Sequence, residues 1–230
     1  MANEPAEIVI EHLGKAPRSR LVLSHLRVAF LAQRGTLVLA DPHFGHHAAF
    51  RAVGVGMPSG VLDADLRRLS AAVERFTPRD ILILGDVLHM KFAITPEVRE
   101  TVHRWRSSFS GRVRTLIGNH DRGLEEIAAS WNIEVIGPEF EEDGLRFDHY
   151  PTPVPDRFVL AGHEHPATAI GSAADGVRLP CFAFCEDVVI LPAFSGMAAG
   201  TARGIPRGAT LFAAGPTGVF EVPGGMRKVR

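Results

Sequence analysis

Three short segments rich in apolar residues place the tightest constraint on how this chain can fold. They are Thr36–Ala40, Ile81–Leu84 and Val113–Ile117, and segments with helical periodicity separate them. Apolar runs this short are typical of strands that are buried on both faces. Strands that alternate with helices in this way predict a parallel sheet covered by helices.

The segments beside these strands have the pattern of amphipathic helices. One helix is expected over Leu62–Phe76, where apolar residues recur every three or four positions. Thr95 and Pro96 predict the start of a second helix, because threonine caps a helix N-terminus and proline fits the first turn. A third, shorter helix is expected over Leu124–Trp131.

The remaining segments indicate short strands punctuated by glycine and proline. The expected strands are residues 6–11, Leu21–Ser24, Val28–Ala32, Ile133–Ile136, Leu145–Asp148, Phe158–Ala161, Cys181–Phe184, Val188–Leu191, Thr210–Ala213 and Val219–Val222. The sequence therefore predicts an α/β fold of one domain over residues 1–230, a β-sandwich with helices on its outer faces. Its parts would be a core carrying the motifs at 36–166, a β-rich part at 167–224 and a frayed basic tail at Met226–Arg230.

Composition narrows the function classes. The net charge is −1, so no global basic field indicates a non-specific coat for nucleic acid, although a local basic rim would suffice for binding. Cys181 and Cys185 are too few for a four-thiolate zinc site and are expected to be reduced core thiols. No signal peptide is visible at Met1–Pro5 and no apolar run could span a bilayer, which predicts a cytoplasmic protein without membrane association.

Polar clusters follow the expected strands at their carboxyl ends. The clusters are Asp41-Pro-His43, Gly85-Asp86, Gly118-Asn-His-Asp121, His149 and Gly162-His-Glu-His165. In open α/β sheets ligands gather beyond the carboxyl ends of strands, so the fold can bring these clusters together.

The donor types in these clusters suit transition metals. Aspartate, asparagine and histidine favour Mn²⁺, Fe or Zn²⁺ over Ca²⁺, which prefers oxygen ligands alone. The candidate ligands exceed the needs of one ion, and two ions about 3.5–4 Å apart would use them all. A carboxylate would then bridge the pair, and Asp86 is the central candidate. We expect two divalent ions, with manganese first and iron or zinc as alternatives.

The motifs D-x-H, G-D, G-N-H-D, a lone histidine and G-H-x-H, in this order, resemble the calcineurin-like metallophosphoesterase superfamily. The resemblance covers residues 36–166 and implies a four-layer β-sandwich flanked by helices and a phosphoester hydrolase. It implies one metal held by Asp41, His43, Asp86 and His165, and another held by Asp86, Asn119, His149 and His163. It also implies that His120 protonates or stabilises the leaving oxygen and that Asp121 orients His120.

Four further segments are similar to a bacterial group within that superfamily, the DNA-ligase-associated metallophosphoesterases. They are Asp41-Pro-His-Phe-Gly45, Gly85-Asp-Val-Leu-His89, Pro180-Cys-Phe182 and Leu191-Pro-Ala-Phe194. This resemblance implies a DNA endonuclease or phosphodiesterase linked to DNA repair, acting on single-stranded or damaged DNA, with repair partners such as a ligase. The chain departs from the group at His46, where the group has a lysine.

Other polar residues near the motifs have two interpretations. Arg51, His46 and His89 could contact substrate, and His89 could equally support a metal ligand. Each of them is also compatible with an ordinary solvated or loop-lining role, as is His47.

Two other functions share these motifs. A small-molecule phosphodiesterase or pyrophosphatase, acting on a cyclic nucleotide or a nucleotide-sugar, would use the same metal core. The absence of a long apolar insertion favours the nuclease over this alternative. A non-catalytic interaction module is the third hypothesis, but such modules tend to lose the catalytic histidine or a ligand, and His120 is present here.

Overall fold

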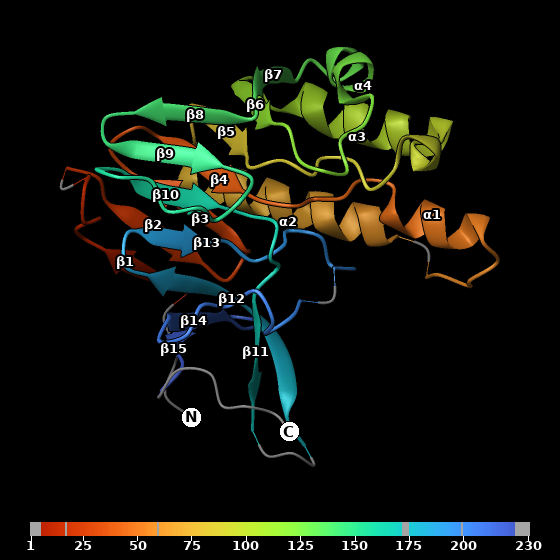
Figure 1. Cartoon of the computed structure of the whole chain (residues 1–230). Helices are drawn as coiled ribbons and strands as arrows, with labels where there is room; N and C mark the ends of the chain where they lie inside the picture. Colours follow the sequence, from red (N-terminus) through yellow and green to blue (C-terminus); the bar gives the residue numbers. More distant parts are fainter. Residues whose placement is uncertain (1–5, 17, 59, 172–174, 199, 224–230) are drawn as a thin grey trace.

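Two β-sheets pack face to face, and helices cover the outer face of one of them (Figure 1). The computed structural model describes residues 6–16, 18–58, 60–171, 175–198 and 200–223, so the expected tail Met226–Arg230 lies outside the described residues. The predicted α/β fold of a single compact domain is confirmed. Within the described part of the chain no helix is long and apolar enough to cross a membrane.

The first sheet has seven strands in the order of the chain. Its strands are β1 (Glu7–Ile10), β2 (Leu21–Ser24), β3 (Val28–Leu31), β4 (Thr36–Leu39), β5 (Asp80–Ile83), β6 (Arg112–Leu116) and β7 (Glu134–Gly137). Strands β1 to β4 pair in antiparallel fashion, and β4 to β7 pair in parallel. The three strands on which the fold prediction depended are therefore adjacent parallel strands at the centre of this sheet.

The second sheet has eight strands in the order β15-β14-β12-β13-β10-β9-β8, with β11 paired to β12 outside this path. Its strands are β8 (Glu139–Glu142), β9 (Leu145–Asp148), β10 (Phe158–Ala161), β11 (Ala167–Ile170), β12 (Val177–Cys185), β13 (Val188–Ile190), β14 (Thr210–Ala214) and β15 (Val219–Glu221). Strands β9, β10 and β13 are parallel neighbours, and the other pairs are antiparallel.

The helices lie on the first sheet, as Figure 1 shows. They are α1 (His46–Ala52), α2 (Val61–Phe76), α3 (Pro96–Ser108) and α4 (Leu124–Ser130), with a short 3₁₀ helix η1 (Lys91–Ala93). One apolar cluster joins them to the sheet; its members include Leu66 and Leu69 of α2, Val102 of α3, and Ile81 and Ile83 of β5. Alternate residues of a strand point to opposite faces, so Leu82 of β5 belongs instead to the cluster between the two sheets.

Two further apolar clusters lie on the two faces of the second sheet, one between the sheets and one on its outer face. Phe147 and Leu160 of the second sheet meet Leu82 and Val38 of the first. The outer face of the second sheet forms a separate cluster, whose cover comes from irregular segments such as the one containing Ile205. The described helices therefore flank the sandwich on one side.

Four elements were not predicted from the sequence, the short η1 among them, and the other three each have a physical reason. Strand β8 has the sequence Glu-Phe-Glu-Glu, an acidic pattern that suits an edge strand paired with cations such as Arg34 and Arg146. Strand β11 is short, small-residue rich and paired only with β12 among the described strands. Helix α1 begins after the left-handed Gly45 and carries no acidic residue in its first turn, so it lacks the usual start signals.

Candidate metal centre

The loops that follow β4 and β5 run side by side. The backbone N–H of His43 donates to the carbonyl of Asp86 at 3.0 Å, and that of Phe44 donates to Val87 at 2.8 Å. Because β4 and β5 are parallel, their carboxyl ends already lie at one edge of the sheet. The loop pairing then extends this alignment to the residues that carry the polar side chains.

The loops from the second sheet meet this edge. The N–H of His163, after β10, donates to Asp41 Oδ2 at 2.9 Å. A Cβ at Gly162 would lie 2.8 Å from Asp41 Oδ2, so glycine is needed for this approach. The N–H of Ser195, after β13, donates to the carbonyl of Asp41 at 3.3 Å. The carboxyl ends of strands from both sheets therefore converge at Asp41.

The backbone is strained at the predicted ligands. Five of them have left-handed φ angles: Asp41 (53°), His43 (44°), Asp86 (49°), His163 (69°) and His165 (46°). Non-glycine residues adopt this region rarely, and such conformations cluster where the surroundings hold a functional geometry in place.

A first group of donors consists of Asp41, His43 and His165. His43 Nε2 and His165 Nε2 are 3.2 Å apart, and His165 Nε2 lies 3.7 Å from Asp41 Oδ2. Asp41 and His43 are buried, with exposed fractions of 0% and 4%. Three donor atoms thus point at one small volume from which water is largely excluded.

A second group consists of Asp86, His149 and His163. Asp86 Oδ2 lies 3.6 Å from His149 Nε2, and His163 Nδ1 lies 3.2 Å from the same nitrogen. Asn119 Oδ1 also approaches His149 Nε2, at 3.0 Å. Asp86 Oδ2 is 3.7 Å from His43 Nε2 of the first group, so its carboxylate lies between the two groups.

These contacts leave lone pairs facing one another. His149 Nδ1 lies 2.9 Å from the carbonyl of Leu84, to which it must donate, so the neutral ring has a bare lone pair on Nε2. That lone pair faces the amide oxygen of Asn119 and the carboxylate of Asp86, which are also acceptors. Buried acceptors without donors are costly, and a cation between them removes the cost.

Two buried polar atoms without hydrogen-bond partners also indicate a metal site. Asp41 Oδ1 and His43 Nδ1 are buried and have no hydrogen-bond partner among the described residues. Imidazole and carboxylate donors in this proportion suit a divalent transition metal. The residues present therefore fit metal ions, and the clusters could hold them.

Burial favours the neutral, ligand form of two imidazoles in the cluster, those of His43 and His163. Burial, followed by the neighbouring imidazoles of His165 and His120, lowers the pKa of His43 to about 2. Burial also lowers the pKa of His163. Burial acts in the same direction on His165, but the hydrogen bond and charge of Asp41 outweigh it and raise the pKa of His165. Burial raises the pKa of Asp86.

His120 stands beside the first group of donors. Its ring lies edge-on to that of His43, with centroids 5.1 Å apart. His120 Nδ1 lies 3.0 Å from the carbonyl of His89, to which it donates, which leaves Nε2 available for a proton. The carbonyl of His89 orients the ring, and among the described residues no hydrogen bond joins Asp121 to His120.

Asp121 instead connects two loops. Its carboxylate accepts the backbone N–H groups of Leu88 at 2.9 Å and Gly118 at 2.8 Å. Burial raises the pKa of Asp121 to about 6, and these two hydrogen bonds oppose that rise. The geometry gives Asp121 a role in holding the loops after β5 and β6 together.

The remaining predicted residues divide into two sets. The ring of His46 stacks on that of His89 at 3.9 Å between centroids, and His89 forms a further donor group with His43 and His120. Arg51 is exposed on α1 and donates to the carbonyl of Pro58 at 3.2 Å. No described contact brings the guanidinium of Arg51 to the donor groups.

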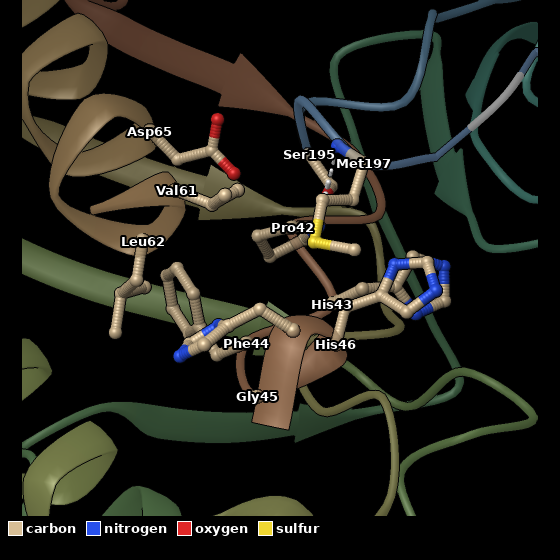
Figure 2. Close-up of a pocket in the computed structure, with 11 residues that line it drawn as sticks. Pro42, His43, Phe44, Gly45, His46, Val61, Leu62, Asp65, Ser195 and Met197 are labelled. Atoms are coloured by element: carbon tan, nitrogen blue, oxygen red, sulfur yellow. Dashed lines mark hydrogen bonds between the residues drawn. The ribbon is translucent and has the colours of Figure 1, made fainter. Parts of the chain in front are cut away.

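Sequence reasoning missed a supporting network behind the centre. Asp65 of α2 is 5% exposed and accepts the N–H of Gly196 at 3.0 Å, next to Ser195, whose N–H reaches Asp41. Figure 2 shows Asp65 on one side of Pro42 and Met197, with the imidazoles of His43 and His46 on the other. The signal was an aspartate on the apolar face of the expected helix Leu62–Phe76.

The structure is similar to solved structures of other proteins. The crystal structure of Pseudomonas putida nuclease MPE resembles this structure with a TM-score of 0.79; the two chains share 29% sequence identity, and the match covers 94% of this chain and 100% of that chain. No protein-family model and no curated protein sequence matches the chain.

Proposed function

We propose that this chain is a dinuclear metal-dependent phosphodiesterase that cleaves DNA. The observation that carries the proposal is the pair of buried carboxylate–imidazole groups with Asp86 between them. The structural match to a nuclease supports nucleic acid as the substrate. The order of the motifs supports membership of the calcineurin-like metallophosphoesterase superfamily.

Each residue has a proposed role. One ion would be held by Asp41, His43, Asp86 and His165, and the other by Asp86, Asn119, His149 and His163. Bound divalent ions supply a nucleophile from water near neutral pH and neutralise charge on phosphoryl oxygens. Manganese is the first proposed ion, with iron or zinc as alternatives, because a mixed set of carboxylate, amide and imidazole donors suits these transition metals.

His120 is the proposed proton donor to the leaving oxygen. The His89 carbonyl holds Nδ1, so the ring is oriented with Nε2 free to carry the transferred proton. His46 and His89 stack beside it and shield one side of the ring from solvent. A role in DNA repair in the cytoplasm, with a ligase among the partners, belongs to the same proposal and rests on the resemblance alone.

A substrate panel tests the proposal. Single-stranded DNA, duplex DNA, RNA, a cyclic nucleotide and a nucleotide-sugar are each incubated with the protein and Mn²⁺, and again with a chelator. The proposal predicts metal-dependent cleavage of DNA, with single-stranded DNA cut fastest. Cleavage of the small molecules alone would establish the small-molecule phosphodiesterase instead, and no cleavage of any diester would refute both.

A further inference from the structure

A hollow lined by cationic side chains shares no lining residue with the donor groups of the metal centre. Its volume is about 320 Å³, far above the roughly 30 Å³ that one water occupies in the liquid. The lining comes from the β2–β3 turn, α2, the start of β12 and the end of β14, and it includes Arg27, Arg68, Arg178 and Pro180. The described lining residues include three arginines and no aspartate or glutamate.

Most hydrogen-bond donors of the three arginines have no protein partner among the described residues. Arg27 Nη1 donates to the carbonyl of Ser195 at 3.0 Å, and Arg178 Nη1 donates to that of Gly200 at 3.1 Å. Arg68 donates through Nη2 to Asp65 and Phe194, while its buried Nε has no partner among the described residues. A guanidinium has five N–H donors, so these contacts leave donors for a ligand.

Positive charge in this hollow is under-compensated. Burial, followed by the charge of Arg68, lowers the pKa of Arg27 to about 10, which still leaves the guanidinium charged at neutral pH. Asp65 is the carboxylate that opposes this effect, and Arg68 already pairs with it at 2.6 Å. Guanidinium groups held together in this way favour an anion, and phosphate matches their planar donor geometry.

The topology places this hollow at the same edge of the molecule as the metal centre. Strand β2 runs parallel to β4, because both are antiparallel to β3, so the β2–β3 turn lies at the edge where β4 ends in Asp41. Neighbouring strands are about 4.8 Å apart, which puts the end of β2 about 10 Å from the end of β4 along this edge. Ser195 joins the two sites, since its carbonyl accepts from Arg27 and its N–H donates to Asp41.

We propose that this arginine hollow binds a backbone phosphate of the nucleic-acid strand whose scissile phosphate lies at the metal centre. The inference rests on the proposed function and adds a second contact that fixes the register of the strand. The two strand ends lie about 10 Å apart, a span that a strand of several nucleotides can bridge. Pro180 lines the hollow and Phe194 packs under Arg68 at 4.6 Å, so two segments singled out in the sequence build this site.

The test compares pocket variants with a charge-matched control. Arg178→Ala and Arg27→Lys alter the hollow, and Arg67→Ala removes the same charge from the exposed side of α2. Affinity for a fluorescent single-stranded DNA is measured in chelator over a range of salt concentrations. A matching dinucleotide, too short to reach both sites, is measured beside it. The ratio of kcat/KM for the oligonucleotide to that for bis(p-nitrophenyl) phosphate is then measured with Mn²⁺.

Both pocket variants are expected to weaken oligonucleotide binding about tenfold, and Arg178→Ala, which removes a charge, should also flatten the salt dependence by about 0.7. Arg27→Lys keeps its charge and loses only the planar donor geometry, so its salt dependence should stay near that of the wild type. The kcat/KM ratio should fall by a similar factor, while dinucleotide binding and the Arg67→Ala variant change less than about twofold. Unchanged oligonucleotide binding in both pocket variants, or an equal loss in Arg67→Ala, would overturn the proposal. If the wild type hydrolyses no diester, the proposed function fails, yet binding in chelator still decides whether the hollow holds DNA.

Discussion

At the scale of single residues, the candidate metal centre has two unusual features. Its backbone is strained, and some of its buried nitrogen and oxygen atoms have lone pairs that accept no hydrogen bond. Five of its residues hold left-handed φ angles, each of which costs on the order of 1–3 kcal/mol. His149 Nε2 faces two acceptors, and Asp41 Oδ1 has no hydrogen-bond partner among the described residues. Both features are explained if the fold is arranged around cations, since coordination satisfies the lone pairs and offsets the strain.

The His120→Ala variant tests the proton donor. We expect it to bind manganese like the wild type but to lose about 10²–10⁴-fold in turnover of a diester with a poor leaving group. The loss should be smaller on a nitrophenyl ester, whose leaving group needs no proton. His103→Ala, on α3 with an exposed ring, is the matched control. Undiminished cleavage of the poor leaving group by His120→Ala would remove this role.

Cys181 and Cys185 provide a residue-scale test of the second sheet. Burial raises the pKa of the Cys181 thiol to about 12, so this thiol stays protonated and unreactive at neutral pH. Cys185 is only partly buried. We expect a thiol reagent to label Cys185 in the folded protein and both cysteines after denaturation, as read by mass spectrometry of the peptides. Equal labelling rates in the folded state would contradict this packing.

At the scale of elements, tight strand-to-loop turns bring the donors together. Gly85, with φ of 82°, follows β5, and a Cβ there would lie 2.7 Å from His149 Nδ1. Gly54 has a similar φ of 80° but open space around it. Both Gly→Ala variants incur the left-handed penalty of about 1 kcal/mol, but only Gly85→Ala also pushes against His149, a proposed metal ligand.

We therefore expect Gly85→Ala to lose most of its manganese affinity while Gly54→Ala keeps it. Isothermal titration with Mn²⁺, together with thermal unfolding of the metal-free proteins, separates the two effects. Equal manganese affinity in the two variants would show that the close approach at Gly85 does not position His149.

Some features of the site could be predicted from the sequence and others could not, depending on whether they are local along the chain. Polar motifs at the ends of β4, β5, β6, β9 and β10 were visible, because apolar strands followed by Asp, Asn and His are local patterns. The brace of Asp65 on Gly196 was not, since it joins residues 131 positions apart and depends on how α2 packs. The ring stack of His46 on His89 depended likewise on helix α1, which has weak start signals.

At the scale of the whole molecule, the sandwich makes one site from both sheets. Asp41 and Asp86 come from the first sheet, and His149, His163 and His165 come from the second. Metal bound between them should therefore stabilise the packing of the two sheets against unfolding. The apparent gain is about 2.7 kcal/mol when free metal exceeds the dissociation constant a hundredfold.

Thermal unfolding with and without Mn²⁺ measures this linkage. The wild type is expected to unfold at a higher temperature with manganese, whereas Asp86→Asn should show little or no rise. Asp63→Asn, on the exposed face of α2, is the control and should behave like the wild type. A rise in Asp86→Asn as large as in the wild type would mean that stabilising metal binds elsewhere.

The most direct measurement is anomalous diffraction from a crystal grown with manganese. The account predicts two anomalous peaks, one against Asp41, His43 and His165 and the other against Asn119, His149 and His163, with Asp86 touching both. A single peak at His43, His89 and His120, or no manganese among these side chains, would contradict it.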